Sequence, residues 1–312
     1  MLLEVNGVTK VFSGPKKSKI IANENLSFSI KEGEIFGLFG HNGAGKTTLV
    51  NQIMGLTSPS SGNINLLGKS VQESPERARS ICSLQPQSQL PLGFLSPTQA
   101  VTIMGKMRGA KKKDVNRRRN ELFQALDIEQ WANTEGNKLS GGIRRLTAFC
   151  IAVIVPGKLV ILDEPTNDVD PVRRRYLWQV IRELISDGTS VILVTHNVLE
   201  AEKAVDRVAI LHKGKFLAKG TPSEVKGTAA NKMRIELNLL DDKQDIEIPD
   251  WVLSSRRKGT RMFFSVNQSS VSLAIDWVSK QVENASIIDY SMSPTTIEDV
   301  YVELTTGKEL SA

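Results

Sequence analysis

The chain has 312 residues, with 40 Lys and Arg against 34 Asp and Glu, giving a formal net charge of +6. Hydrophobic residues make up 40% and charged residues 24% of the chain, which is ordinary for a soluble globular protein. No stretch approaches the roughly 20 apolar residues that a membrane-spanning helix needs, so a membrane role would require a partner protein. Aromatic residues (5%) do not interleave with the basic runs, so no nucleic-acid stacking platform is expected.

Three basic runs, Lys111–Lys113, Arg117–Arg119 and Arg173–Arg175, are interpreted as solvated helix faces. Binding of anionic lipid or nucleic acid is the alternative for them. Cys82 and Cys150 lie far apart and lack metal-ligand spacing, which favours a packing role in a reducing compartment. The amino end has no basic start followed by an apolar core, so we expect no signal peptide.

Strand patterns open the chain. Alternating residues predict antiparallel strands at Leu2–Val8 and Ile21–Ile30, with a turn at Gly14–Lys17 between them. The apolar run Ile35–Phe39 ends in a glycine-rich segment, and helical periodicity follows over Lys46–Leu56. The order strand, loop and helix is therefore predicted here.

The middle of the chain predicts a buried sheet flanked by helices. Leu95–Val155 is mainly helical in pattern. Leu159–Leu162 and Val191–Thr195 are continuous apolar runs, as in strands of a parallel sheet that is covered on both faces. We expect an α/β fold with a mixed sheet core.

The composition changes after Gly220-Thr221-Pro222, and we predict one domain over residues 1–225 and a small α+β domain over 226–312. The expected elements of the smaller domain are strands at Met233–Leu240, Met262–Val266 and Ser286–Met292, and a helix at Val271–Val282. Ser293 is expected to cap a last helix that has Pro294 at its first position.

One segment fits the phosphate-binding loop pattern completely: Gly40, His41, Asn42, Gly43, Ala44, Gly45, Lys46 and Thr47, followed by Thr48. Glycines let the backbone curl so that N–H groups point inward at a helix start, where the dipole favours anions. Lys46 is predicted to reach the β- and γ-phosphates, and the Thr47 hydroxyl to bind Mg²⁺. A chance glycine-rich turn is the alternative, but the preceding strand and following helix argue against it.

Two acids end a buried strand. Asp163 and Glu164 follow Leu159–Leu162, and the carboxyl edge of a parallel sheet is where ligands bind. Asp163 is predicted to hold Mg²⁺, and Glu164 to polarise the attacking water as a general base. The alternative is a strand that ends in two solvated acids without a catalytic role.

Two further segments point to the same chemistry. His196 follows the strand Val191–Thr195 and would lie at the same edge, within reach of a γ-phosphate. Leu139–Gly142 opens a helix, where Ser140 could cap the helix, face ATP bound by another copy, or do both.

Together these motifs make the sequence resemble the ATP-binding cassette (ABC) family, over about residues 2–225. The phosphate loop, the Leu-Ser-Gly-Gly signature with Ser140, Gly141 and Gly142, the Asp163-Glu164-Pro165 segment and His196 occur in the family's order. By resemblance, Gln87 is the lid glutamine that touches Mg²⁺ and senses the membrane partner, Asp170 lies in the loop that links two ATP sites, and Phe12 stacks on adenine.

The resemblance implies a head-to-tail dimer that closes on two ATP molecules and reopens after hydrolysis, which Glu164, His196 and Lys46 would support. It implies a peripheral position on the cytoplasmic face of the membrane, where the motion drives a polytopic permease docked near Gln87. Ile143 departs from the Gln that is common at the fifth signature position, and Asn167-Asp168-Val169 from Ser-Gly-Leu.

The ending Ser293–Val300 with Leu304-Thr305 resembles the tail of drug-exporter cassettes, which favours export. The alternative function is a soluble mechanical ATPase of the same family that acts on ribosomes, DNA or iron–sulfur assembly. A third hypothesis, an ATP-gated scaffold without hydrolysis, is disfavoured because Glu164 and His196 are both present. No nucleic-acid partner is expected.

Overall fold

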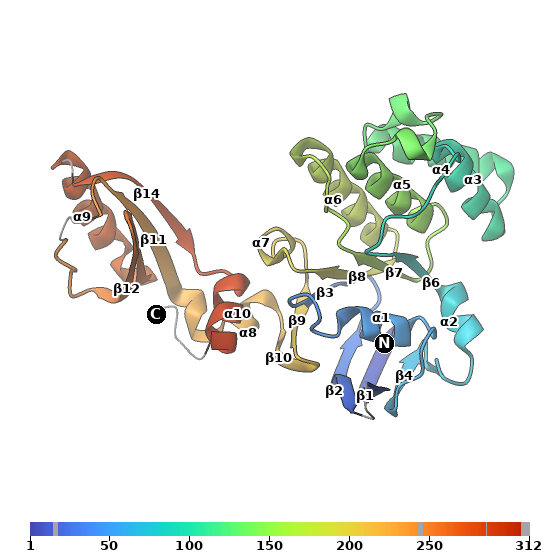
Figure 1. The fold of residues 1–312 in the computed structure, drawn as a ribbon, viewed down its shortest axis with the longest axis horizontal. Coiled ribbons are helices and arrows are strands. Elements are labelled where there is room, and N and C mark those ends of the chain that lie inside the picture. The colour runs from blue at the N-terminus through green and yellow to red at the C-terminus, as the bar shows by residue number, and fades with distance from the viewer. Residues whose placement is uncertain (15–17, 243–245, 285, 307–312) are drawn as a thin grey trace. The chain divides into compact units, whose positions relative to one another are not determined.

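The computed structural model describes residues 1–14, 18–242, 246–284 and 286–306. The chain folds into two compact units, residues 1–218 and 219–312 (Figure 1). Residues 15–17 of the predicted turn lie outside the described ranges. None of the helices within those ranges combines the length and the hydropathy that a membrane span requires.

The first sheet of the N-terminal unit has the strand order β2-β1-β4-β5. Its strands are β1 (Leu3–Ser13), β2 (Lys19–Ile30), β4 (Ser61–Leu66) and β5 (Lys69–Ser70). The antiparallel pairing of β1 with β2 confirms the prediction for the start of the chain. Strand β1 also pairs with β4, so its alternating apolar side chains enter the core along the centre of this sheet.

The second sheet has six strands in the order β10-β9-β3-β8-β7-β6. They are β3 (Ile35–Phe39), β6 (Cys82–Gln85), β7 (Leu159–Asp163), β8 (Ser190–Thr195), β9 (Arg207–His212) and β10 (Lys215–Gly220). Strands β3, β7 and β8 are parallel neighbours and every residue in them is buried. Burial on both faces explains their continuous apolar runs.

The N-terminal unit has the helices α1 (Lys46–Ile53), α2 (Pro75–Ile81), α3 (Pro97–Met107), α4 (Lys112–Ala125), α5 (Gly141–Val153), α6 (Pro171–Ser186) and α7 (Val198–Ala201). Figure 1 shows α3, α4 and α5 gathered beyond the β6 side of the second sheet. One hydrophobic core contains side chains of α1 and of both sheets, so α1 packs between the sheets. The core therefore fixes where the loop before α1 lies.

Helix starts follow local capping rules. Ser96 and Gln99 form a reciprocal capping box at α3, with Pro97 in the first turn. Ser140 caps α5, accepting from Ile143 N, and Asp170 caps α6, accepting from the two N–H groups that follow Pro171. These caps place the ends of α5 and α6 that carry predicted site residues.

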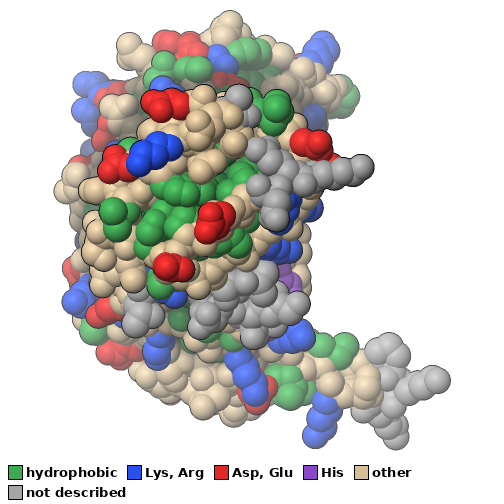
Figure 2. Space-filling model, turned by 90° about the vertical axis from the view of Figure 1, so that its left-hand side faces the viewer, with side chains coloured by type: hydrophobic (Ala, Val, Ile, Leu, Met, Phe, Trp, Pro, Cys, Tyr) green, Lys and Arg blue, Asp and Glu red, His purple; other side chains and the backbone are tan. Residues whose placement is uncertain are grey.

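The C-terminal unit is an antiparallel sheet in the order β12-β13-β11-β14. Its elements are α8 (Pro222–Lys226), β11 (Lys232–Leu239), β12 (Val252–Lys258), β13 (Arg261–Asn267), α9 (Val271–Glu283), β14 (Ile287–Pro294) and α10 (Ile297–Thr306). The core lies between the sheet and α9. Outside it, Leu273, Ile275, Ile288 and Tyr290 are exposed, and Figure 2 shows hydrophobic side chains gathered on one face of this unit.

The predicted cap of the last helix is wrong. Ser293 and Pro294 belong to β14, where they pair with Arg234 and Met233 of β11. The helix begins at Ile297, and Thr296 caps it, because its Oγ1 accepts from Asp299 N while Asp299 Oδ2 accepts from Thr296 N. Proline fits the end of an edge strand, where no neighbour needs its missing N–H.

Candidate nucleotide-binding site

The sheet register brings three predicted segments to one edge. In the parallel pair β3–β8, Phe39 lies opposite Thr195, and in β7–β8, Asp163 lies opposite Val194. The loop after β3, the acids that end β7 and His196 after β8 therefore meet at the carboxyl edge of adjacent strands. This is the juxtaposition that the sequence predicted.

The glycines of the loop are required by its conformation. Gly45 has a φ of +109°, and a Cβ there would lie 2.2 Å from Ala22 O. A Cβ on Gly40 would lie 2.2 Å from Leu211 O. Because Gly45, the N-cap of α1, has no side chain to cap the helix, the first N–H groups of α1 are left to bind an anion.

The ammonium of Lys46 is folded back into this loop. It donates to Gly40 O at 2.6 Å and His41 O at 3.1 Å, and the residue is 7% exposed. Burial lowers the pKa of Lys46, and the charges of Glu164 and Asp163 partly offset that effect. A cation that is already inside the loop is placed to meet a phosphate.

Asp163 is buried near one negative and two positive side chains. Burial raises its pKa to about 6, repulsion from Glu164 adds to the rise, and Lys46 and Arg145 oppose it. Because the two cations do not offset burial and the charge of Glu164, a divalent cation would stabilise the carboxylate of Asp163. The exposed Thr47 offers a hydroxyl at the start of α1. These oxygen donors fit Mg²⁺, for which Asp163 and Thr47 would be the ligands.

The carboxylate of Glu164 is held by three hydrogen bonds, although the residue is only 1% exposed. Its Oε1 lies 2.5 Å from Nδ1 of His196 and accepts the His196 backbone N–H at 2.9 Å. Its Oε2 accepts the hydroxyl of Thr195 at 2.8 Å. The structure thus joins Glu164 to His196 directly, in an arrangement suited to a general base oriented by a second residue.

The signature segment packs on the loop between β7 and α6. Ser140 Oγ accepts from Ile143 N at 3.4 Å, as a cap, so that interpretation is confirmed. A Cβ on Gly142 would lie 2.5 Å from Asp168 O, so a glycine allows this close approach. A contact between Ser140 and ATP bound to another copy stays a prediction, as does a role for Asp170 between two sites.

Gln87 is exposed, and its carbonyl accepts Arg145 Nη2 at 2.7 Å, while Pro86 O accepts Nη1 at 3.0 Å. Arg145, on α5, was not predicted, because one buried arginine in a helix carries no motif. Phe12 lies on β1, 41% exposed, with Lys10 Nζ 5.0 Å from its ring centroid. Contacts of Gln87 with Mg²⁺ and of Phe12 with adenine stay predictions.

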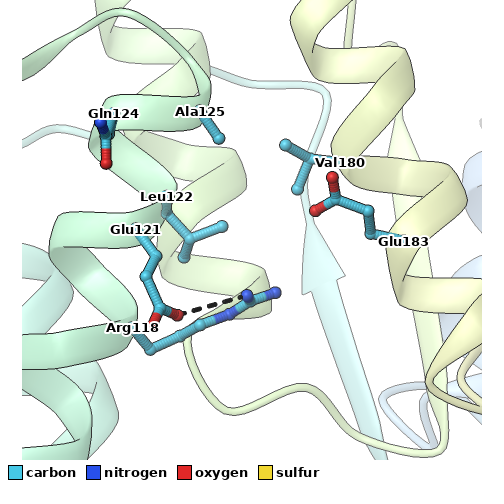
Figure 3. Close-up of a pocket in the computed structure, with 7 residues that line it drawn as sticks. All are labelled: Arg118, Glu121, Leu122, Gln124, Ala125, Val180 and Glu183. Carbon is cyan, nitrogen blue, oxygen red and sulfur yellow. Dashed lines mark ion pairs between the residues drawn. The ribbon is translucent and has the colours of Figure 1, made fainter.

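A shallow hollow of about 370 Å³ lies elsewhere, between α4 and α6 (Figure 3). Arg118 and Glu121 form an ion pair on its α4 side, and Val180 and Glu183 line it from α6. None of its lining residues belongs to the predicted site. The hollow is therefore separate from the nucleotide chemistry at the carboxyl edge of the sheet.

A phosphate-binding loop that opens a helix beside a carboxylate pair defines a P-loop nucleotide-binding protein. Residues 23–167 match the family described as ABC transporter. The chain is 30% identical over 306 residues to the Nod factor export ATP-binding protein I of Mesorhizobium japonicum, covering 97% of this chain and 86% of that protein.

The chain is 33% identical to the ATP-binding cassette sub-family A member 17 of Rattus norvegicus, covering 97% of this chain but only 18% of that much longer protein. A solved structure described as the ATP-binding subunit of an ABC transporter superposes with a TM-score of 0.66 at 27% identity, over 72% of this chain and 92% of that one. The chain belongs to the ATP-binding cassette family, whose domains bind and hydrolyse ATP.

Proposed function

We propose that this chain hydrolyses ATP to drive a substrate through a membrane permease, from a peripheral position on the cytoplasmic face. The contact between Glu164 and His196 at the phosphate-loop edge carries the proposal. In it, Lys46 and the first N–H groups of α1 bind the β- and γ-phosphates, and Glu164 takes the proton of the attacking water. Bound Mg²⁺ would neutralise phosphate charge beside Thr47, Asp163 and Gln87.

Export is the proposed direction. The tail segments Ser293–Val300 and Leu304-Thr305 resemble the ending of drug exporters, and the Mesorhizobium relative is named an export protein. We further propose that two copies close on two ATP molecules, with Ser140, Gly141 and Gly142 of one facing the nucleotide of the other. Residues 226–312 would serve as an accessory domain to this cassette of residues 1–225.

Three variants test the ATPase proposal. Glu164→Gln should bind ATP with unchanged affinity, form an ATP-dependent dimer and lose turnover, since an amide cannot accept the proton. Lys46→Ala should lose ATP affinity. Ser140→Ala should keep ATP binding by the monomer and lose hydrolysis. Normal turnover by Glu164→Gln would refute the assignment of the base.

The partner is tested by purifying the tagged Glu164→Gln chain with ATP from its native host in mild detergent. A polytopic membrane protein should accompany it, and Lys46→Ala, which should not form the closed dimer, is the control. Recovery of ribosomes, DNA or assembly proteins without a permease would support the soluble mechanical ATPase instead.

A further inference from the structure

The hydroxyl of Thr195 accepts one hydrogen bond and donates another, and the structure determines the partner of each. Thr195 ends β8 and is 3% exposed. Its Oγ1 accepts the backbone N–H of Asn197 at 2.9 Å and lies 2.8 Å from Oε2 of Glu164. Because a backbone N–H can only donate, the oxygen of Thr195 is the acceptor in the first bond and its single proton goes to the carboxylate.

The two oxygens of Glu164 are therefore held in different ways. Oε2 is bound by a buried hydroxyl whose backbone belongs to the central sheet. Oε1 accepts the backbone N–H of His196 and is also bound by the His196 ring, a side chain that is 51% exposed. A half-exposed ring can rotate away from its partner, whereas a buried β-branched side chain has few alternative rotamers.

The backbone of Glu164 needs such support. Its φ of +52° lies in the left-handed region, which is unfavourable for a residue other than glycine. Its N–H donates to Val194 O at 2.8 Å, so the backbone as well as the carboxylate is fixed on the end of β8. The orientation of Glu164 is thus imposed by residues 194–196.

We propose that Thr195 is a positioning residue for hydrolysis, holding Oε2 of Glu164 so that Oε1 faces the attacking water when the His196 ring moves aside. This inference depends on the proposed role of Glu164 as the base. Thr195 contacts Oε2 and not Oε1, the oxygen that would take the proton, so loss of its hydroxyl should reduce kcat and leave ATP binding nearly unchanged.

The test compares Thr195→Val, which keeps the branched shape without the hydroxyl, with Thr195→Ser, which keeps the hydroxyl. In the full-length chain, kcat of Thr195→Val should fall about 10- to 100-fold, with the KM and the Kd for ATP within about twofold of the parent. Thr195→Ser should retain kcat within about threefold. If the valine variant does not fold, Thr195→Ala replaces it.

A double-mutant cycle separates this inference from the proposed function. Because Thr195 acts through Glu164, Thr195→Val should cause no further loss of residual turnover in the Glu164→Gln background. A wild-type kcat for Thr195→Val, equal losses in the valine and serine variants, or a further loss in that background would overturn the positioning role. Full turnover by Glu164→Gln alone would instead overturn the proposed function.

Discussion

Nη2 of Arg173 lies 2.5 Å from Oδ2 of Asp127, joining the first turn of α6 to the turn that follows α4. The same guanidinium lies 4.7 Å from the ring centroid of Trp131 and donates through Nη1 to Oδ2 of Asp170 at 3.1 Å. One side chain thus ties the capping residue of α6 to the helical segment that leads to α5.

Arg173→Ala should lower the free energy of unfolding by about 1 kcal/mol, because the ion pair is half exposed while the stacking on Trp131 is also lost. Arg173→Lys should recover only part of this, since an ammonium lacks the planar fork. Urea denaturation measures the difference. The exposed Arg175→Ala is the matched control, and an equal loss there would show that net charge, not the contact, matters.

Gly142 should not tolerate a side chain. A helical glycine replaced by alanine usually gains stability, yet a Cβ here would lie 2.5 Å from the backbone oxygen of Asp168. Gly142→Ala should therefore lower stability by about 2 kcal/mol in thermal or urea unfolding. For the control Gly141→Ala, the nearest atom is the flexible Gln89 Nε2 at 3.2 Å, and a change within about 0.5 kcal/mol is expected.

Asp163→Asn should stabilise the nucleotide-free chain at neutral pH. The native pKa of about 6 exceeds that of an unfolded aspartate, about 4, so the folded state binds the proton more tightly. The contribution of Asp163 to stability is therefore complete below pH 4 and is lost as the pH rises through 6. At pH 7 the variant should exceed the parent by on the order of 2 kcal/mol.

The measurement is the difference in unfolding free energy between parent and Asp163→Asn from pH 7 to pH 4, without nucleotide. The advantage of the variant should shrink as the pH falls, and a difference that does not vary with pH would contradict the assignment. The Mg²⁺-dependent affinity for ATP should fall in the same variant, because a neutral amide is a poorer Mg²⁺ ligand than a carboxylate.

The core strands could be predicted because burial on both faces leaves a continuous apolar run, as in Ile35–Phe39 and Leu159–Asp163. Strand β12 was missed because most of it is the polar run Ser254–Lys258. An edge strand can be this polar, and the run lacks the apolar–polar alternation by which a strand facing a core is predicted. Ser293-Pro294 has the local signature of a helix start, and pairing with β11 overrode it.

The positions of the phosphate loop, Asp163, Glu164 and His196 followed from the rule that parallel strands share a carboxyl edge. The contacts of Arg145 with the Gln87 carbonyl and of Thr195 with Glu164 could not be predicted from the sequence. They depend on which side chains face each other across separate elements, and neither residue occurs in a motif that fixes this.

Both thiols should be inert in the folded chain. Cys82 and Cys150 are free and buried. Burial raises the pKa of Cys82 to about 12, with a partial offset from Arg108, and burial also raises the pKa of Cys150. Because the thiolate is the reacting form, a disulfide reagent at pH 8 should modify the native chain at least about 100-fold more slowly than the chain unfolded in guanidinium chloride. The variant Cys82→Ser shows which of the two thiols accounts for any residual reaction. Fast modification of Cys150 in the native chain would contradict its position in the core.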